Sequence, residues 1–260
     1  STPKPSSAAS DVYKRQLKPE RDNCCIPFDQ GYYVMAQIYR VLGYSDPEYA
    51  TMLHDSSGYK HFTFSYILGR MAITDAGLKP VNQNLFIIIS SSDSRFIKTL
   101  VSGFLDHPHL KIRKTLLFLE NVEIVKRPEF QETMRFRTIS PIVVRKPVMK
   151  GSRLSSYELH PDDPEFYTYL IENLKRRYAD FYGEYPEDKY IRVKFLEFKP
   201  KRHRIGKEWW RASQGVFEVS GDLSLMEYAY DAGLGEKNSC GFGCIEITGM
   251  NKNEKNRCNC

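Results

Sequence analysis

The sequence has no long hydrophobic run, and its cysteines are few and badly spaced for cross-linking. The longest purely aliphatic or aromatic run is Leu85 to Ile89, whereas a membrane-spanning helix needs about 20 apolar residues. Ser1 to Ser10 contains no apolar segment of the kind that a secretory signal peptide carries. The six cysteines fall in adjacent or nearly adjacent pairs, which make poor disulfide partners. We therefore expect a protein of the reducing cytoplasm with no membrane span.

Negative charge is in the minority. The chain has 38 Lys and Arg against 32 Asp and Glu, and the net charge of +6 favours an anionic partner without requiring one. Basic residues are densest between Ile191 and Arg211, where eight of them accompany only Glu197 and Glu208. A stripe of this density predicts a phosphate-binding surface, and a solvated charged face is the alternative.

The length of 260 residues suffices for two compact domains. In the first half, apolar periodicity and capping residues predict each element. These are a strand over 12–17, a helix over 32–42 that stops at Gly43, a short helix from Asp46 to His54, strands over 62–68 and 85–90, a helix capped by Asp93, and a strand over 115–125. The strand over 62–68 should be buried mainly on one face. Residues 1–16 are small and polar before they turn basic, and we expect them to be non-native.

A similar order of elements begins again after Arg127-Pro128-Glu129. The pattern predicts a strand over 133–146, a helix that opens at Asp163 and stops at Gly183, a hairpin of 191–195 with 215–219, a short helix over 223–230 and a strand over 244–247, with a loose tail over 251–260. Two successive βαββαβ units predict an α+β protein of two tandem ferredoxin-like domains, which we place at 1–128 and 129–260.

A glycine-rich segment, GLGEKNSCGFG over 233–243, lies between the last predicted helix and the last predicted strand. Its glycines allow positive φ angles and close approach of the backbone to another group. This suits amide donors and Lys237 that contact phosphates, or packing on the other domain. The segment lacks the Gly-Lys-Ser/Thr ending of a Walker loop and follows a helix, so it is neither a Walker loop nor a Rossmann turn.

This segment resembles the glycine-rich loop of the CRISPR-associated repeat-RNA endoribonucleases, the sixth Cas family of the RAMP superfamily. The resemblance extends to IPFDQGYYVMAQIYRVL near the start, FRTISPIVVRK at the opening of the second half, and FKPKRHRI, so it spans roughly Leu17 to Gly249. It implies an endoribonuclease that cleaves CRISPR repeat RNA in precursor transcripts without metal or other cofactor and releases mature guide RNA. Subunits of a CRISPR effector complex are a further implied partner, and a homodimer is left open.

Cleavage of this kind uses the ribose 2′-hydroxyl beside the scissile phosphate as the nucleophile. It leaves a 2′,3′-cyclic phosphate and a 5′-hydroxyl. The reaction needs a base for the 2′ proton, an acid for the departing 5′ oxygen, and a cation that offsets charge on the phosphorane.

In archaeal-type members of the family, the catalytic triad is a Tyr in the first helix, a His fifteen residues later and a Lys six beyond that. Tyr39, His54 and Lys60 match both spacings. His54 titrates nearest neutrality, which favours it as the base and Tyr39 as the acid. The helix end at His54 favours its protonated form, so the reverse assignment stays open. Lys60 would supply the fixed positive charge.

Each member of this triad has an ordinary structural interpretation when it is taken alone. Tyr39 lies on an apolar helix stripe, His54 at a helix end, and Lys60 among surface cations. Only their joint spacing favours a site. His61 is the main rival, but it begins a predicted strand, so its side chain should point to the opposite face from Lys60.

For RNA binding we select the basic hairpin and the glycine-rich segment. The selected residues are Lys199, Lys201, Arg202, Arg204, Gly233, Gly235, Lys237, Gly241 and Gly243. A second basic set contains Arg145, Lys146, Lys150 and Arg153. Trp209 and Trp210 could stack on bases, but adjacent residues of a strand face opposite ways, so at least one should belong to the core.

Two alternatives remain at this stage. Cys240, Cys244, Cys258 and Cys260 offer four thiols, but their spacing is unusual for zinc ligands and we expect no metal. The alternative function is a non-catalytic or weakly catalytic relative that holds repeat RNA within an effector complex.

Overall fold

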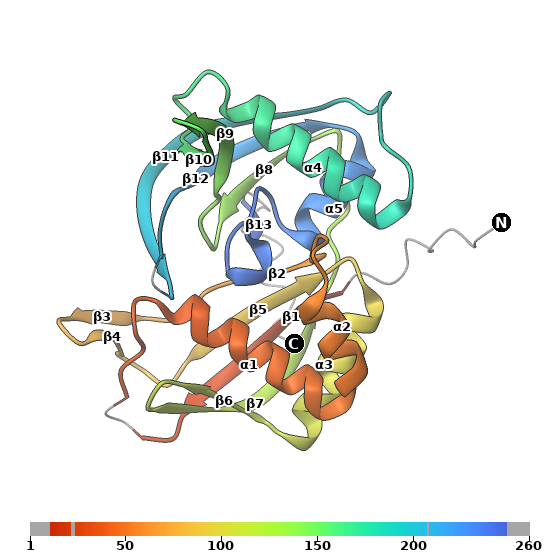
Figure 1. Ribbon diagram of the computed structural model, residues 1–260. Coiled ribbons are helices and arrows are strands. Elements are labelled where there is room, and N and C mark those ends of the chain that lie inside the picture. The colour runs from red at the N-terminus through yellow and green to blue at the C-terminus, as the bar shows by residue number, and fades with distance from the viewer. Residues whose placement is uncertain (1–10, 22–23, 207, 249–260) are drawn as a thin grey trace.

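The computed structural model describes residues 11–21, 24–206 and 208–248, which form two halves built on one topology (Figure 1). We call the described residues up to Val125 the N-terminal half and those from Thr133 onward the C-terminal half. In each half, helices pack against an antiparallel sheet, and the two halves meet beside the short strand β2 (Phe62–Phe64). Among these residues, no helix combines the length and the apolar character that a membrane crossing requires.

The N-terminal half contains a five-stranded sheet in the order β2-β5-β1-β7-β6. Its other elements are β1 (Asp11–Pro19), α1 (Gln30–Ser45), α2 (Pro47–Asp55), β3 (Met71–Thr74), β4 (Gly77–Pro80), β5 (Leu85–Ser91), α3 (Ser94–Asp106), β6 (His109–Ile112) and β7 (Thr115–Val125). The strand expected over 12–17 is confirmed as part of β1, which pairs with both β5 and β7. Residues 1–10 lie outside the described part of the chain, and the non-native origin of 1–16 stays a prediction.

The C-terminal half contains a four-stranded sheet in the order β11-β12-β8-β13. Its elements are β8 (Thr133–Thr138), β9 (Val144–Lys150), β10 (Arg153–Leu159), α4 (Phe166–Tyr182), β11 (Ile191–Ile205), β12 (Glu208–Gly221), α5 (Leu223–Ala232), η1 (Asn238–Cys240) and β13 (Ile245–Ile247). In both halves the four strands of the βαββαβ unit stand in the order second, third, first, fourth. The predicted tandem ferredoxin-like fold is therefore confirmed, whereas the domain boundary at 128/129 stays a prediction.

Helices α1 and α2 meet at Asp46 without an intervening loop. The backbone N–H of Asp46 donates to the carbonyl of Leu42, and its side chain accepts from the backbone N–H of Tyr49. The predicted stop at Gly43 is wrong, because α1 continues to Ser45. The stop comes instead from Pro47, which restricts Asp46 to an extended conformation (φ −147°, ψ 86°). In this conformation Asp46 serves as the N-cap of α2.

Helix α3 holds α1 against the sheet. The side chain of Asp93 accepts from the backbone N–H of Arg95, as predicted for a cap, and Phe96, Leu100 and Phe104 form the buried stripe. Gly103 lies where the two helices cross, and a Cβ there would overlap the carbonyl oxygen of Val41. The absence of a side chain at Gly103 thus allows the close crossing that fixes α1.

The strand expected over 62–68 is shorter and more deeply buried than predicted. Only Phe62–Phe64 forms β2, and Thr63 and Ser65 are buried as completely as the neighbouring Phe62 and Phe64. The expectation of one buried face is wrong because the C-terminal half covers the second face. The hydroxyl of Thr63 donates to the carbonyl of Phe242 at 2.9 Å.

Three features of the C-terminal half also differ from expectation. The strand over 133–146 is split into β8 and β9, and the chain between them contains Pro141. Asp163 accepts from the backbone N–H of His160 in a turn, and α4 begins only at Phe166. The hairpin of β11 and β12 is far longer than predicted. Gly183 does end α4, with φ of 81°.

Candidate active site

Tyr39 projects from α1 toward the end of α2. Its ring lies edge-on to the ring of His54, with centroids 5.4 Å apart and an interplanar angle of 86°. It also contacts the ring of Phe62, which is fully buried. Burial, and secondarily the thiol of Cys240, raises the pKa of Tyr39 to about 12. The phenol is therefore protonated at neutral pH and can donate a proton.

His54 lies in the last turn of α2 and is exposed. Its Nδ1 lies 2.9 Å from a carboxylate oxygen of Asp55. An ionised carboxylate only accepts hydrogen bonds, so Nδ1 carries the proton in this contact. In the neutral ring with this tautomer, Nε2 carries the lone pair, which is the state required of a base.

A polar network fixes α2, and so His54, to the start of α3. The hydroxyl of Tyr49 donates to Asp93 at 2.6 Å, and the Arg95 guanidinium donates to Asp46 at 2.8 Å. The same guanidinium lies over the Tyr49 ring. Burial and the carboxylate of Asp93 raise the pKa of Tyr49, which keeps this hydroxyl a donor. The helix that carries His54 is thereby held at its N-cap and in its first turn.

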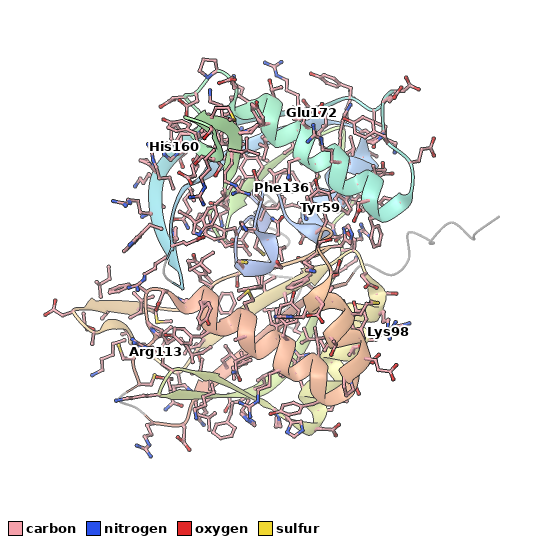
Figure 2. The ribbon with its side chains drawn as sticks, viewed as in Figure 1. Tyr59, Lys98, Arg113, Phe136, His160 and Glu172 are labelled. Carbon is pink, nitrogen blue, oxygen red and sulfur yellow. The ribbon has the colours of Figure 1, made fainter. Side chains whose placement is uncertain are left out.

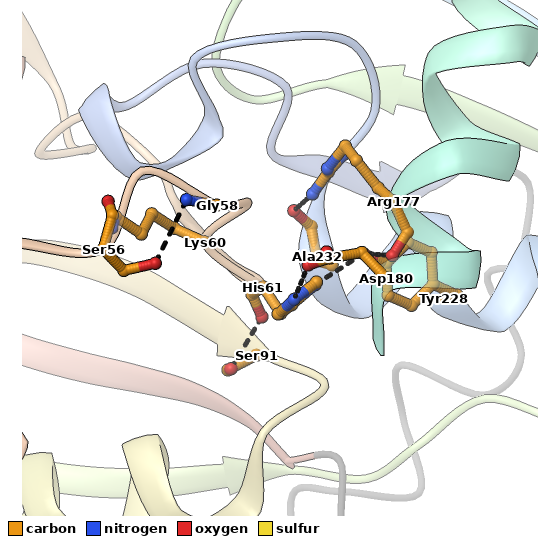
Figure 3. Close-up of polar contacts among 9 residues, drawn as sticks. All are labelled: Ser56, Gly58, Lys60, His61, Ser91, Arg177, Asp180, Tyr228 and Ala232. Carbon is orange, nitrogen blue, oxygen red and sulfur yellow. Dashed lines mark hydrogen bonds and ion pairs between the residues drawn. The ribbon is translucent and has the colours of Figure 1, made fainter. Parts of the chain in front are cut away.

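Lys60 lies in the connection between α2 and β2. Its ammonium donates to the carbonyl of Ser56, the C-cap residue of α2, at 2.5 Å (Figure 3). Desolvation lowers the pKa of Lys60, and the nearby carboxylate of Asp55 partly opposes that effect. Asp55 therefore lies between His54 and Lys60, in contact with the first and in electrostatic range of the second. Figure 2 shows Tyr59, from the same connection, at the boundary of the two halves.

The structure thus brings Tyr39 and His54 into ring contact and places Lys60 on the connection that leaves the His54 helix. Their catalytic roles stay a prediction. Asp55 was not selected from the sequence, although its position next to His54 could have suggested it. The effects of Tyr49 on α2 and of Cys240 on Tyr39 arise from contacts between separate elements and have no local signal in the sequence.

The glycine-rich segment packs against the N-terminal half. Its four glycines are all buried, and a Cβ at Gly241 would lie 2.8 Å from the ring of Phe64. Of the two interpretations of this segment, domain packing is the one that the glycines' burial supports. Lys237 differs from them because it is exposed, adopts a left-handed conformation, and places its ammonium 5.1 Å from the centre of the Trp210 ring.

The hairpin of β11 and β12 carries the other selected cations. Its four basic residues, Lys199, Lys201, Arg202 and Arg204, are exposed. The hairpin also contacts the N-terminal half, because the hydroxyl of Tyr66 lies 2.8 Å from Nδ1 of His203. Burial, and secondarily Lys201, lowers the pKa of His203 to about 4. This histidine is therefore neutral at pH 7, and the positive charge of the hairpin comes from its Lys and Arg residues.

The two tryptophans face opposite ways, as predicted. Trp209 is 57% exposed and Trp210 is 9% exposed. The guanidinium of Arg202 lies 5.3 Å from the centre of the Trp209 ring, so an exposed aromatic surface and a cation stand together. Such a pair can stack on a base and contact its phosphate.

Two members of the second basic set, Arg145 and Lys146, are engaged with acids of this chain. Arg145 donates to Glu236 through Nε at 2.7 Å, and Lys146 pairs with Glu165. These pairs neutralise charge, so the first set is the better candidate for RNA. In the described residues no group of three or more His, Cys, Asp or Glu side chains could hold a metal ion. Cys258 and Cys260 lie outside that part of the chain.

Comparison with known families identifies both halves. Residues 25–123 match the family described as "CRISPR-associated protein Cas6, N-terminal", and residues 125–247 match "CRISPR associated protein Cas6, C-terminal". A Methanocaldococcus jannaschii protein named "CRISPR-associated endoribonuclease Cas6 1" is 34% identical over 245 residues, which cover 93% of this chain and 95% of that protein.

Solved structures agree with these matches. The structure described as "Characterization of a Cas6-related gene from Pyrococcus furiosus" has a TM-score of 0.87 and 30% identity, over 94% of this chain and 100% of that chain. A second, "An RAMP protein binding different RNA substrates", has a TM-score of 0.86 and 30% identity, over 92% and 100%.

Proposed function

The chain belongs to the Cas6 family of CRISPR-associated endoribonucleases and is an endoribonuclease; from that premise we propose that Tyr39, His54 and Lys60 cleave CRISPR repeat RNA. The observation that carries this proposal is the ring contact of Tyr39 with His54, at a centroid distance of 5.4 Å, at the end of a helix anchored by its own network. The substrate is precursor RNA and the product is mature guide RNA.

In the proposed reaction, Nε2 of His54 takes the proton of the ribose 2′-hydroxyl. The 2′ oxygen then forms a bond to phosphorus, and the bond from phosphorus to the 5′ oxygen breaks. Tyr39 gives its proton to the departing 5′ oxygen, and the Lys60 ammonium offsets the charge that develops on the phosphorane. The products carry a 2′,3′-cyclic phosphate and a 5′-hydroxyl. Because the nucleophile belongs to the RNA, no metal ion is needed to activate water.

The raised pKa of Tyr39 favours this assignment over the reverse one. A phenol with a pKa of about 12 is a poor base at neutral pH because it is almost fully protonated. The exposed Nε2 of His54, with Nδ1 held by Asp55, suits proton abstraction.

Two substrates test the reaction. The protein is incubated in EDTA with repeat RNA, and with the same RNA carrying one 2′-deoxy sugar at the cut. We expect cleavage of the first only, with a cyclic phosphate at the new end. Cleavage of the deoxy substrate, or a requirement for added metal, would rule out the mechanism.

A third substrate tests the two roles separately. A 5′-thio leaving group departs without protonation, so it should restore cleavage by Tyr39→Phe but leave His54→Ala inactive. Restoration of His54→Ala instead would establish the reverse assignment.

For binding, we propose that Lys199, Lys201, Arg202, Arg204 and Lys237 contact the RNA phosphates, and that Trp209 stacks on a base. Their exposure and shared sign of charge support this. Association with effector-complex subunits, a homodimer and a cytoplasmic location are part of the same proposal. Co-purification from the native host with and without ribonuclease would test the association with effector-complex subunits. Light scattering at several protein concentrations would test the homodimer.

A further inference from the structure

The proposed site leaves His61 without a role, although it follows Lys60 directly in the chain. The His61 side chain is 16% exposed and turns toward the C-terminal half, away from Lys60 (Figure 3). Its Nδ1 lies 2.8 Å from the hydroxyl of Tyr228 on α5, and its Nε2 lies 3.1 Å from a carboxylate oxygen of Asp180 on α4. His61 is thus bound by two helices of the other half.

The contact with Asp180 indicates which ring nitrogen of His61 carries a proton. Burial, and secondarily the charge of Arg177, lowers the pKa of His61, although Asp180 opposes the shift. A neutral ring has one donor and one acceptor. Nε2 then donates to the Asp180 carboxylate, which can only accept, while Nδ1 lies within hydrogen-bond distance of the Tyr228 hydroxyl.

The backbone of His61 is fixed as well. Its carbonyl oxygen accepts from the hydroxyl of Ser91 at 2.7 Å and from the backbone N–H of Ser92 at 3.1 Å. Lys60, one residue earlier, points the other way and donates to Ser56. The peptide that joins Lys60 to His61 therefore leads from an exposed connection into a firmly held position.

The partners of His61 are themselves anchored to the glycine-rich segment. The buried guanidinium of Arg177 donates to the carbonyls of Ala232 at 2.6 Å and Gly233 at 2.8 Å. The Tyr228 hydroxyl also lies 3.0 Å from the carbonyl oxygen of Arg177. A chain of polar contacts thus runs from His61 to the segment that packs beside Tyr39.

We propose that His61 is a positioning residue, which fixes the backbone next to Lys60 to helices α4 and α5 so that the Lys60 ammonium is held in place for cleavage. The inference rests on the proposed function, because it requires Lys60 to act in the reaction. It assigns no contact with the RNA to His61. Its consequence is that the C-terminal half, through α4 and α5, helps to place a reacting group of the N-terminal half.

A double-mutant cycle tests whether His61 acts through Lys60. Single-turnover cleavage of repeat RNA is measured at saturating protein for the wild type, His61→Ala, Lys60→Ala and the double variant, together with the RNA Kd of each. We expect His61→Ala to slow cleavage about tenfold or more, because misplacement of a reacting group by about 1 Å is costly. We expect its Kd to stay within about twofold of the wild type. In the Lys60→Ala background, His61→Ala should cause no further loss.

His160→Ala is the matched control. His160 is also a half-buried histidine with a hydroxyl partner, because its Nδ1 lies 2.9 Å from the hydroxyl of Ser213. It belongs to the C-terminal half and should leave the cleavage rate unchanged. Asp180→Ala removes one anchor at an exposed position, so it tests the inference even if His61→Ala does not fold. We expect Asp180→Ala to slow cleavage about threefold to tenfold when Lys60 is present, and to cause no further loss in the Lys60→Ala variant.

Three results would overturn the inference. The first is an unchanged rate for both His61→Ala and Asp180→Ala. The second is an equal loss from His61→Ala in the presence and absence of Lys60, since that would show a general structural role. The third is an unchanged rate for Lys60→Ala alone, which removes Lys60 from the proposed function. The single Lys60 variant therefore distinguishes failure of the proposed function from failure of the His61 inference.

Discussion

The two halves share one strand order but differ in where each departs from the basic βαββαβ unit. Besides the added strands β3, β4 and β6, the N-terminal half departs after its first helix, where α2 and its connection to β2 carry His54 and Lys60. Besides the added strands β9 and β10, the C-terminal half departs in the hairpin between its second and third strands, in which β11 and β12 reach 15 and 14 residues. Equivalent frameworks thus carry different additions. The first half should control the rate of cleavage and the second the affinity for RNA.

The largest expected effect is the loss of cleavage in His54→Ala. Removal of a general base should lower the single-turnover rate about 10²- to 10⁴-fold, while the RNA Kd stays within about twofold. Rates at saturating protein and filter-binding titrations measure the two quantities. If His54→Ala itself bound RNA poorly yet cleaved normally once saturated, the proposed division between the halves would be contradicted.

The converse variant replaces Lys199, Lys201, Arg202 and Arg204 with Ala. Because these cations are exposed, we expect the fold to survive and the RNA Kd to rise by about 10²-fold at physiological salt. The dependence of log K on log salt should become shallower by about 0.7 per lost phosphate contact with single-stranded RNA. The saturated cleavage rate should remain that of the wild type. A large fall in that rate with an unchanged salt dependence would contradict the prediction.

The pH profile separates Lys60 from Tyr39 within the N-terminal half. The pKa of Lys60 is lowered, so its charge is lost earlier as pH rises, whereas Tyr39, with a pKa of about 12, stays almost fully protonated at pH 10. The alkaline fall in rate should therefore come from Lys60. Lys60→Arg keeps its charge, so the ratio of its rates at pH 10 and pH 8 should exceed the wild-type ratio. His54→Ala corrects for uncatalysed hydrolysis, and an unchanged ratio would remove Lys60 from this role.

The smallest expected effect concerns the contact between the halves. Gly241 and Gly183 have similar φ angles of 87° and 81°, but only Gly241 has a neighbour, Phe64, that a Cβ would meet. Both Ala variants incur the cost of a left-handed residue, about 1 kcal/mol. Gly241→Ala should lower the free energy of unfolding by about 1 kcal/mol more, because it also overpacks the contact. Urea denaturation measures the free energy of unfolding of both variants. Equal decreases would show that the contact between residue 241 and Phe64 accommodates a methyl group without cost.

Local features of the structure followed directly from the sequence. The caps at Asp46 and Asp93 and the stop at Gly183 depend on a few neighbouring residues, and all three are confirmed. The repeated order of elements was also readable, because it needs only periodicity and turns. The stop at Gly43 was wrong because glycine permits a helix end without requiring one, and Pro47 imposed it slightly later.

Features that depend on contacts between the halves were not readable. Thr63 and Ser65 alternate with aromatic residues, as in a strand with one buried face. No neighbouring residue in the sequence indicates that the C-terminal half covers the other face. The pairing of His61 with Tyr228 spans 167 residues, and that of Tyr66 with His203 spans 137. A single sequence contains no periodicity that links such positions. The spacing of Tyr39 and His54 was matched only through family resemblance, and the structure supplied their contact.

The shared residue Asp46 explains why that spacing can serve as a signature at all. With no loop at the junction of α1 and α2, the number of residues from Tyr39 to His54 sets their relative direction. One added residue within either helix would rotate everything beyond it by about 100° and advance it by about 1.5 Å. The turn at Gly151, where a Cβ would meet nothing within 4 Å, has no such constraint. Insertions and deletions should therefore be tolerated very unevenly along this chain. Between Tyr39 and His54 a change of length by even one residue should separate the two rings.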